Sequence, residues 1–194
     1  MIHFKQSPIN IDTNELMPLD RTASFHYELE TFHVCDNGQN ISLTPLDAKS
    51  YVLKNNHKFY ITEMHFHRPS EHHVDDIEFD MEVHIVHQLE HETLVYSVLL
   101  NITDDGLHFG APFSNLNADI DVDLSALVPN NCWDYHGSFT TSPFDETVIW
   151  LINQVQLEIN RDQANLLNSF YPANNRCLQP VGQRRVYSIA TTSH

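Results

Sequence analysis

Histidines gather in residues 64–88, where six of the 25 residues are histidine. His65 and His67 are two residues apart, and His84 follows Glu82 at the same spacing. Because side chains alternate between the two faces of a β-strand, residues at this spacing point to the same side. If the two strands lie next to each other in one sheet, His65, His67 and His84 can converge on a single point. Three imidazoles with a fourth position open are the arrangement of a catalytic zinc site.

Such a site would do acid–base chemistry on water. Three neutral imidazoles leave a zinc ion doubly positive, and that charge can lower the pKa of a bound water from about 15.7 to about 7. Each ligand ring also needs a partner for its second nitrogen. Glu63 and Glu82 stand two residues before His65 and His84, and Glu71 lies in the loop between them. The chain has 14 histidines, so a chance H-x-H pair without a metal stays open as the alternative.

The elements that would position these histidines are mostly strands. β-Branched and aromatic residues favour strands over residues 24–34, 40–46, 58–67, 79–88, 93–102 and 145–153. One late segment, residues 160–170, is expected to be helical, with Asn160 as N-cap and Ala164, Leu167 and Phe170 on one side. Runs of strands joined by short turns favour a mainly antiparallel sheet.

Composition excludes several classes of function. The 194 residues are 41% hydrophobic and 19% charged, which is typical of a globular chain that folds as one domain. The formal net charge of −16 argues against nucleic acid and against an anionic membrane, because both need a basic surface. A small molecule is the expected partner.

The sequence also predicts a cytoplasmic protein. The first ten residues contain no apolar signal-peptide core, and the best apolar run, residues 94–100, is too short to span a bilayer. A processed secreted form is the alternative. Three cysteines without a C-x-x-C pair, Cys35, Cys132 and Cys177, do not form a disulfide framework.

Five motifs extend the histidine pattern across nearly the whole chain. They are QSPINI (residues 6–11), HFHRPSEH (65–72), EVHIVH (82–87), DYHGSFTTSPFDETVIW (134–150) and NNRCLQP (174–180). Together and in this order they resemble the alpha class of carbonic anhydrases. The resemblance implies a mainly β (α+β) fold. It would be a single domain over residues 1–194, short at the N-terminus for the family, on a large, central, twisted, predominantly antiparallel sheet with a few short peripheral helices.

The resemblance also assigns roles. His65, His67 and His84 would bind Zn²⁺, and Glu82 would orient His84. Thr140 would accept a hydrogen bond from zinc-hydroxide and donate to Glu71, because an ionised carboxylate can only accept. The implied reaction is the reversible hydration of carbon dioxide to bicarbonate and a proton, inhibited by sulfonamides.

The substrate pocket follows from the same motifs. Thr141 would contact bicarbonate, and an apolar wall would hold CO2 beside the nucleophile. That wall is expected to comprise Val86, Val95, Phe139, Val148 and Trp150. The sequence leaves the oligomeric state open, with a homodimer as one option.

The chain departs from the family pattern at several positions. Gln39 stands where the family has its proton-shuttle histidine, and glutamine does not titrate near pH 7, so inefficient proton release is expected. His33 and His73 are alternative shuttles. Glu63 replaces a usual glutamine beside His65, which should raise the pKa of the bound water. Phe144 occupies a position where secreted bacterial members often carry a disulfide cysteine.

Two other functions are weighed against this one. The H-x-H-x3-E spacing of His65, His67 and Glu71 also fits a cupin-type iron or manganese site, but the asparagine of the second cupin motif is missing after His84. An anhydrase-like domain that binds a partner without catalysis is the second alternative. Such domains usually lose a zinc histidine, whereas all three are present in this sequence.

Overall fold

The computed structural model describes residues 4–38, 40–109 and 116–193. Its elements are mostly strands, with one α-helix and one short 3-10 helix among these residues. The strands are β1 (Asn10–Ile11), β2 (Met17–His26), β3 (Leu29–Asp36), β4 (Ile41–Pro45), β5 (Tyr51–Lys54), β6 (His57–His67), β7 (His73–Val74), β8 (Met81–Leu89), β9 (Glu92–Thr103), β10 (Asp119–Asp123), β11 (Asn131–Gly137), β12 (Val148–Asn153), β13 (Leu157–Asn160) and β14 (Tyr187–Ser193). The helices are η1 (Leu124–Leu127) and α1 (Arg161–Phe170).

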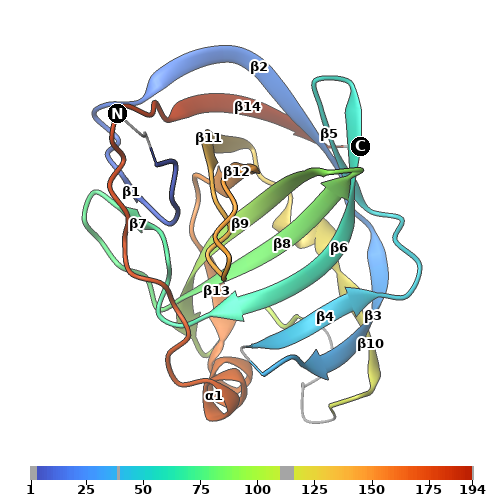
Figure 1. Ribbon diagram of the computed structural model, residues 1–194. Helices are drawn as coiled ribbons and strands as arrows, with labels where there is room; N and C mark the ends of the chain where they lie inside the picture. Colours follow the sequence, from blue (N-terminus) through green and yellow to red (C-terminus); the bar gives the residue numbers. More distant parts are fainter. Residues whose placement is uncertain (1–3, 39, 110–115, 194) are drawn as a thin grey trace.

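Twelve of the strands form one large twisted sheet, and β1 and β7 form a separate small pair (Figure 1). Antiparallel strands β6, β8 and β9 lie at its centre. Strands β4 and β5 pair with the outer edge of β6, whereas β12 and β13 run parallel to β9. The prediction of a mainly β fold with a large, predominantly antiparallel sheet is confirmed, with parallel pairing where β12 and β13 meet β9 and where β14 meets β2.

The pairing register of β6 and β8 decides where the histidines lie. His65 is directly opposite His84, and His67 is opposite Glu82. Residues directly opposite each other on antiparallel strands project to the same face of the sheet. A register one residue away would move His84 to the opposite face. The register of β6 and β8 therefore produces the convergence that the spacing predicts.

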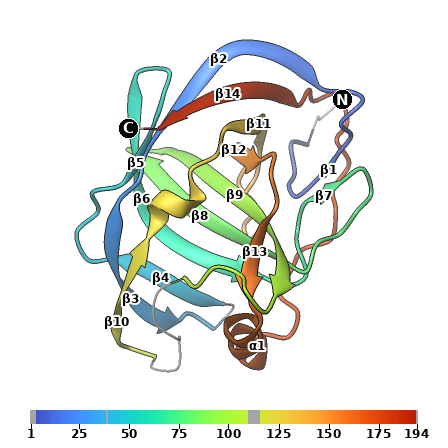
Figure 2. The same ribbon diagram turned by 180° about the vertical axis from the view of Figure 1, so that it is seen from behind.

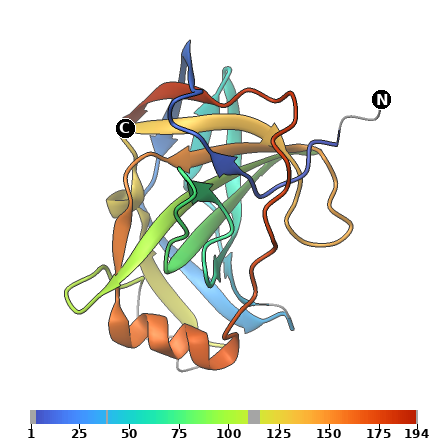
Figure 3. The same ribbon diagram turned by 90° about the vertical axis from the view of Figure 1, so that its left-hand side faces the viewer.

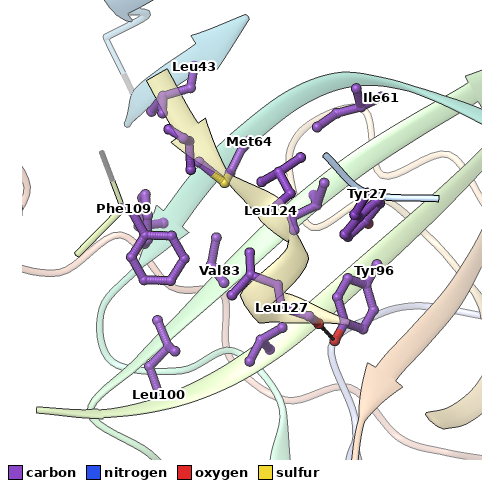
Figure 4. Packing of buried hydrophobic residues seen from close by; sticks show 14 of the residues in the cluster. Tyr27, Leu43, Ile61, Met64, Val83, Tyr96, Leu100, Phe109, Leu124 and Leu127 are labelled. Atoms are coloured by element: carbon purple, nitrogen blue, oxygen red, sulfur yellow. Dashed lines mark hydrogen bonds between the residues drawn. The ribbon is translucent and has the colours of Figure 1, made fainter. Parts of the chain in front are cut away.

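The opposite face of these central strands forms the main hydrophobic core. Met64 on β6 and Val83 on β8 are completely buried, and they pack with residues from β4 and η1 (Figure 4). The hydroxyl of Tyr96 donates a hydrogen bond to the carbonyl oxygen of Leu127 at 2.6 Å, which closes this core at η1. Truncating a buried residue such as Met64 to alanine typically costs about 2–5 kcal/mol of stability. The site's strands are thus anchored by the core behind them.

One predicted strand is wrong. Residues 24–34 alternate as a single strand would, but the chain bends at Glu28 and divides into β2 and β3. The Glu28 N–H donates to the hydroxyl of Ser50, and its carbonyl accepts from the Leu124 N–H. Strand β2 pairs with β5 and β14, whereas β3 pairs with β4 and β10. The alternation of polar and apolar residues continues through the bend, so the sequence does not reveal it. The change of partner strands depends on tertiary contacts.

The predicted helix is confirmed as α1, which lies at one end of the molecule below β13 (Figures 2 and 3). The Asn160 side chain accepts hydrogen bonds from the Asp162 and Gln163 N–H groups, as expected of an N-cap. Ala164 and Leu167 are buried against the core, and Phe170 packs beside them half-buried. In the described part of the chain, no helix combines the length and apolarity needed to cross a membrane.

Candidate metal centre

The structure brings the three predicted histidines together on one face of β6 and β8. The ring centroids of His65 and His67 are 5.0 Å apart, those of His65 and His84 5.2 Å, and those of His67 and His84 4.5 Å. One nitrogen from each ring lies within 4.8 Å of the others. The side chains of His67 and His84 are 2% exposed, and that of His65 is 12% exposed. The cluster is therefore largely buried, with His65 as its most exposed member.

The outer partners of two rings fix which nitrogen faces inward. Nε2 of His84 donates to Oε1 of Glu82 at 2.8 Å, so its Nδ1 carries the lone pair. Nδ1 of His67 donates to the carbonyl oxygen of Asn174 at 3.1 Å, so its Nε2 carries the lone pair. Nε2 of His67 is buried and has no hydrogen-bond partner among the described residues. An unpartnered buried nitrogen of this kind is what a metal ligand looks like without its ion.

The third ring has a looser outer partner. Nδ1 of His65 lies 2.9 Å from Oε1 of Glu63, in an ion-pair contact that is not a well-directed hydrogen bond. The contact with His65 lowers the pKa of Glu63, against the opposing effect of partial burial. An ionised carboxylate on Nδ1 leaves Nε2 of His65 as the inward atom. The predicted pairing of Glu63 with His65 is present.

Burial keeps two of these rings neutral. It lowers the pKa of His67 well below 6.5 and that of His84 to about 4, and neighbouring histidines contribute in the same direction to both. A neutral imidazole offers a lone pair, whereas an imidazolium cannot bind a metal. Neutral rings, oriented outer nitrogens and an unpartnered inward nitrogen all suit a divalent cation. The residues present therefore fit a zinc ion.

Glu82 is completely buried and accepts five hydrogen bonds. Oε1 accepts from the Ser97 hydroxyl at 2.5 Å, from Nδ1 of His72 at 2.7 Å and from His84. Oε2 accepts from the N–H groups of Glu71 and His72 at 2.8 and 2.7 Å. Burial opposes its ionisation, but the contacts with His72 and His84 outweigh this and hold the pKa of Glu82 well below its usual value.

This saturation excludes a second metal site. His72, Glu82 and His84 also lie within ligand distance of one another. The facing atoms of these three residues are already used in hydrogen bonds, so no lone pair there is free for an ion. Glu71 belongs to neither ligand group among the described residues, although a cupin-type site would require it as a ligand.

The sequence alone did not identify the network behind Glu82. Nε2 of His72 lies 2.6 Å from the hydroxyl of Tyr135, which lies 2.9 Å from the hydroxyl of Ser7. Tyr135 and Ser7 belong to motifs that were recognised, yet their contact spans 128 residues of chain. A polar residue in each motif was the available signal. Their partners could not be assigned before the strands were placed.

Glu71 lies beside two of the three clustered histidines, His67 and His84. Its Oε1 accepts from the Arg176 N–H at 2.8 Å and lies 3.5 Å from Nδ1 of His67. Burial and the nearby charge of Glu82 raise the pKa of Glu71 to about 8, against opposing interactions with the Thr140 hydroxyl and Arg176. The expected hydrogen bond from Thr140 to Glu71 stays a prediction, because Oε2 of Glu71 is buried without a hydrogen-bond partner among the described residues, although the Thr140 hydroxyl acts to lower the pKa of Glu71. A divalent cation nearby would favour the ionised carboxylate that the expected hydrogen-bond direction requires.

The residues predicted to form the apolar wall pack together, although none of them lines the cavity that reaches His67. Four of its members are buried together in a second hydrophobic cluster, and Phe139 packs against them half-buried. Trp150 lies against the His84 ring, with centroids 4.9 Å apart, and its Nε1 donates to the Ser138 carbonyl oxygen at 3.1 Å. The four buried members are Val86, Val95, Val148 and Trp150.

A cavity of about 460 Å³ reaches the cluster at His67. His67, Thr140 and Thr141 line it, together with Phe144 and Tyr171. Gln39, the position expected to correspond to the proton shuttle, lies outside the described residues.

The two alternative shuttle histidines do not line this cavity. Nδ1 of His33 lies 2.8 Å from Oδ1 of Asp119, and Nε2 of His73 lies 3.6 Å from Oε1 of Glu78. Both therefore have acidic partners away from the cluster. Among the described lining residues, His67 is the one histidine, and its lone pair faces the other ligands.

Comparisons with known proteins identify the family of the chain. The family model for the eukaryotic-type carbonic anhydrases matches residues 3–190. A carbonic anhydrase of Nostoc sp. is 27% identical over 198 residues, covering 94% of this chain and 75% of that protein. The alpha-carbonic anhydrase from Thermovibrio ammonificans, solved with the inhibitor sulfanilamide, is 26% identical with a TM-score of 0.85, covering 94% of this chain and 86% of that one.

The fold is also shared with dioscorin, solved in complex with ascorbate. That structure is 24% identical, has a TM-score of 0.84, and covers 97% of this chain and 87% of its own. At this identity the likeness shows the fold alone.

The chain belongs to the eukaryotic-type carbonic anhydrase family. Its enzyme class is that of the carbonate dehydratases, which are lyases. Family and fold together support hydration of carbon dioxide by a zinc enzyme, and the resemblance identified in the sequence is confirmed.

Proposed function

We propose that this chain hydrates carbon dioxide reversibly to bicarbonate and a proton, with zinc held by His65, His67 and His84. The observation that carries the proposal is the orientation of the rings. Each outer nitrogen faces a protein oxygen, and the inward nitrogens face one another. When bound, zinc acts as a Lewis acid that makes water acidic enough to supply a nucleophile near neutral pH.

The chain's own residues would hold this ligand set rigid. Glu82 fixes the tautomer and orientation of His84, and the Asn174 carbonyl does the same for His67. Glu82 is itself held by four further hydrogen bonds, so the His84 ring cannot rotate without breaking a buried network. Glu63 orients His65 less tightly, through a single contact at the exposed edge of the cluster.

Thr140 would orient the attacking oxygen. If its hydroxyl proton is donated to Glu71, only lone pairs are left to face the nucleophile. The nucleophile must then donate its own proton toward Thr140 and direct a lone pair elsewhere. Thr141, which lines the same cavity, would contact bicarbonate. These assignments require Glu71 to be ionised in the zinc-loaded protein.

The apolar wall would hold carbon dioxide without polar contacts. CO2 has no net charge and no dipole, so an apolar surface of Val86, Val95, Val148 and Trp150 with Phe139 can hold it weakly beside the nucleophile. The same surface excludes competing water. Bicarbonate is charged and has no favourable contact with that wall, which favours its release toward the open cavity.

The proton would leave without a histidine shuttle. Glutamine at position 39 cannot titrate near pH 7. Among the described residues that line the cavity, His67 is the one histidine, and it is assigned to zinc. We therefore expect turnover to be limited by proton transfer to buffer. Stopped-flow CO2 hydration should accelerate as imidazole buffer is raised at constant pH and ionic strength. An unchanged turnover number would contradict this part of the proposal.

One preparation tests the function as a whole. Bound metal is measured by mass spectrometry, and CO2 hydration is measured with and without a primary sulfonamide. Zinc near one per chain together with inhibitable hydration is expected. Iron or manganese in the purified protein would favour the cupin-type chemistry, and zinc without hydration would favour a non-catalytic binding domain.

A further inference from the structure

A second hollow lies away from the histidine cluster, between the two ends of the chain. It has a volume of about 680 Å³, compared with about 460 Å³ for the cavity that reaches His67. The N-terminal segment before β1 and the segment leading into β14 form its walls side by side (Figure 3). A hydrogen bond from the Gln179 N–H to the Pro8 carbonyl oxygen, 2.8 Å long, ties the two segments together.

The hollow is basic in an acidic protein. Lys5, Arg184 and Arg185 line it, and its lining includes no aspartate or glutamate among the described residues. The whole chain has 10 basic and 26 acidic residues, so three of its ten cations face one hollow. The arrangement therefore favours an anion there despite the net charge of −16.

Glu146 interacts electrostatically with Arg184, but the three cations form no ion pair in the described part of the protein. None of the three has a carboxylate within ion-pair distance there. The Glu146 carboxylate accepts hydrogen bonds from the backbone N–H of Lys5 at 2.7 Å and from the Gln6 side chain at 2.8 Å.

Arg184 is preorganised, whereas the other two cations are exposed. Its guanidinium donates to the carbonyl oxygens of Val181, Pro180 and His136 at 3.0, 2.8 and 3.4 Å. It also lies over the Tyr135 ring, 5.6 Å from the centroid. A guanidinium held in this way loses little side-chain entropy when it meets an anion.

The rest of the lining is largely apolar. The Phe4 side chain is 67% exposed, which is unusual for phenylalanine. Val181 and Tyr187 continue the apolar surface around the cations. Ligand sites typically have about 300–1,000 Å³, mostly apolar walls and a few convergent polar groups. This hollow has all three properties.

We propose that this hollow binds a small organic anion with an apolar body. The anionic head, a carboxylate or a phosphate, lies between Arg184, Arg185 and Lys5, and the body packs on Phe4 and Val181. The proposal uses no residue of the histidine cluster and does not rest on zinc. Its failure and the failure of the proposed hydration activity are therefore separate outcomes.

Isothermal titration calorimetry at low ionic strength tests it, with a primary sulfonamide present to exclude anions from the histidine cavity. The probes are 4-phenylbutyrate, phenyl phosphate and the neutral amide of 4-phenylbutyrate. We expect saturable binding of at least one of the two anions and at least about tenfold weaker binding of the amide. Whether the carboxylate or the phosphate binds more tightly identifies the preferred head group.

Charge reversal locates the site. The double variant Lys5→Glu/Arg185→Glu should weaken anion binding at least about tenfold, because two attractive charges become repulsive. The matched control is Arg21→Glu/Lys49→Glu, which makes the same change of net charge at two exposed positions outside the hollow and should bind as the unmodified protein does. Circular dichroism confirms that both variants are folded.

Three results would overturn the proposal. They are no saturable binding of either anion, equal weakening by the control variant, and sedimentation of the unmodified protein as a dimer that Lys5→Glu/Arg185→Glu converts to a monomer. The last result would identify the hollow as an interface between two copies of this chain.

Discussion

His84 and His87 lie three residues apart on β8, both buried, yet they face opposite sides of the central sheet and have different surroundings. Both nitrogens of His87 have partners, the Tyr27 hydroxyl at 2.9 Å from Nε2 and the Leu94 carbonyl oxygen at 3.3 Å from Nδ1. His84 has a partner on Nε2 alone, and its Nδ1 faces two other rings. A buried histidine is thus a candidate metal ligand when a protein oxygen orients one ring nitrogen and the other nitrogen, without a partner, faces further histidine rings.

The largest expected effect separates these two histidines directly. His84→Ala should reduce zinc affinity more than the roughly 10- to 100-fold typical of losing an outer partner, and should abolish measurable hydration. His87→Gln should keep about one zinc per chain and lose about 1–3 kcal/mol of stability through its buried hydrogen bonds. Metal content, stopped-flow hydration and urea unfolding measure the three quantities. Equal metal loss in both variants would show that the face of the strand does not matter.

The next prediction concerns how firmly the oriented nitrogen must be held. Glu82→Gln removes the buried charge that accepts from His72, Ser97 and His84 at once. We expect zinc affinity to fall about 10- to 100-fold, because the amide cannot accept every one of these bonds. Competition with a chelator measures the affinity, and circular dichroism checks the fold. An unchanged affinity in a folded variant would mean that the Glu82 network serves stability alone.

The pH dependence of stability should show that folding keeps the His87 ring neutral. Burial lowers the pKa of His87 to about 3, below the roughly 6.5 of an unfolded histidine. Below pH 6.5 the unfolded chain therefore binds a proton that the folded chain does not, and stability falls as the pH falls. His87 should contribute up to about 1.4 kcal/mol per pH unit between pH 6.5 and pH 3.

Unfolding of the two proteins at two pH values checks this. Between pH 7.5 and pH 5.5, His87→Gln should lose about 1.4 kcal/mol less stability than the unmodified protein. Other titrating groups contribute equally to both and cancel in the difference. The same pH sensitivity in both proteins would place the proton uptake elsewhere.

The smallest expected effect sharpens the comparison within the cluster. Glu63 touches His65 through one contact at a partly exposed edge, whereas Glu82 is fully buried behind His84. Glu63→Gln removes a negative charge beside the cluster and should move the midpoint of the hydration-rate profile to lower pH, by on the order of half a unit. Hydration rates measured from pH 6 to pH 10 test this. A midpoint that stays in place would show that solvent screens the Glu63 charge.

Local spacing predicted much of the candidate site. The i, i+2 spacing of His65 with His67 and of Glu82 with His84 assigns each pair to one strand face, because alternation is a property of the backbone alone. The same logic placed α1, since Asn160 caps a helix through contacts within three residues. It failed at Glu28, where alternation continues through a bend that the change of partner strands imposes.

The sequence by itself determined the ligand types, their spacing and the resemblance to one enzyme family. Only the tertiary structure decided which nitrogen of each ring faces inward. That depends on the Asn174 carbonyl, 107 residues from His67, and on the Tyr135–Ser7 pair behind Glu82. It likewise brought Lys5 beside Arg184 and Arg185 at opposite ends of the chain. Spacing rules reach a few residues, whereas these contacts exist only after the sheet has brought distant segments together.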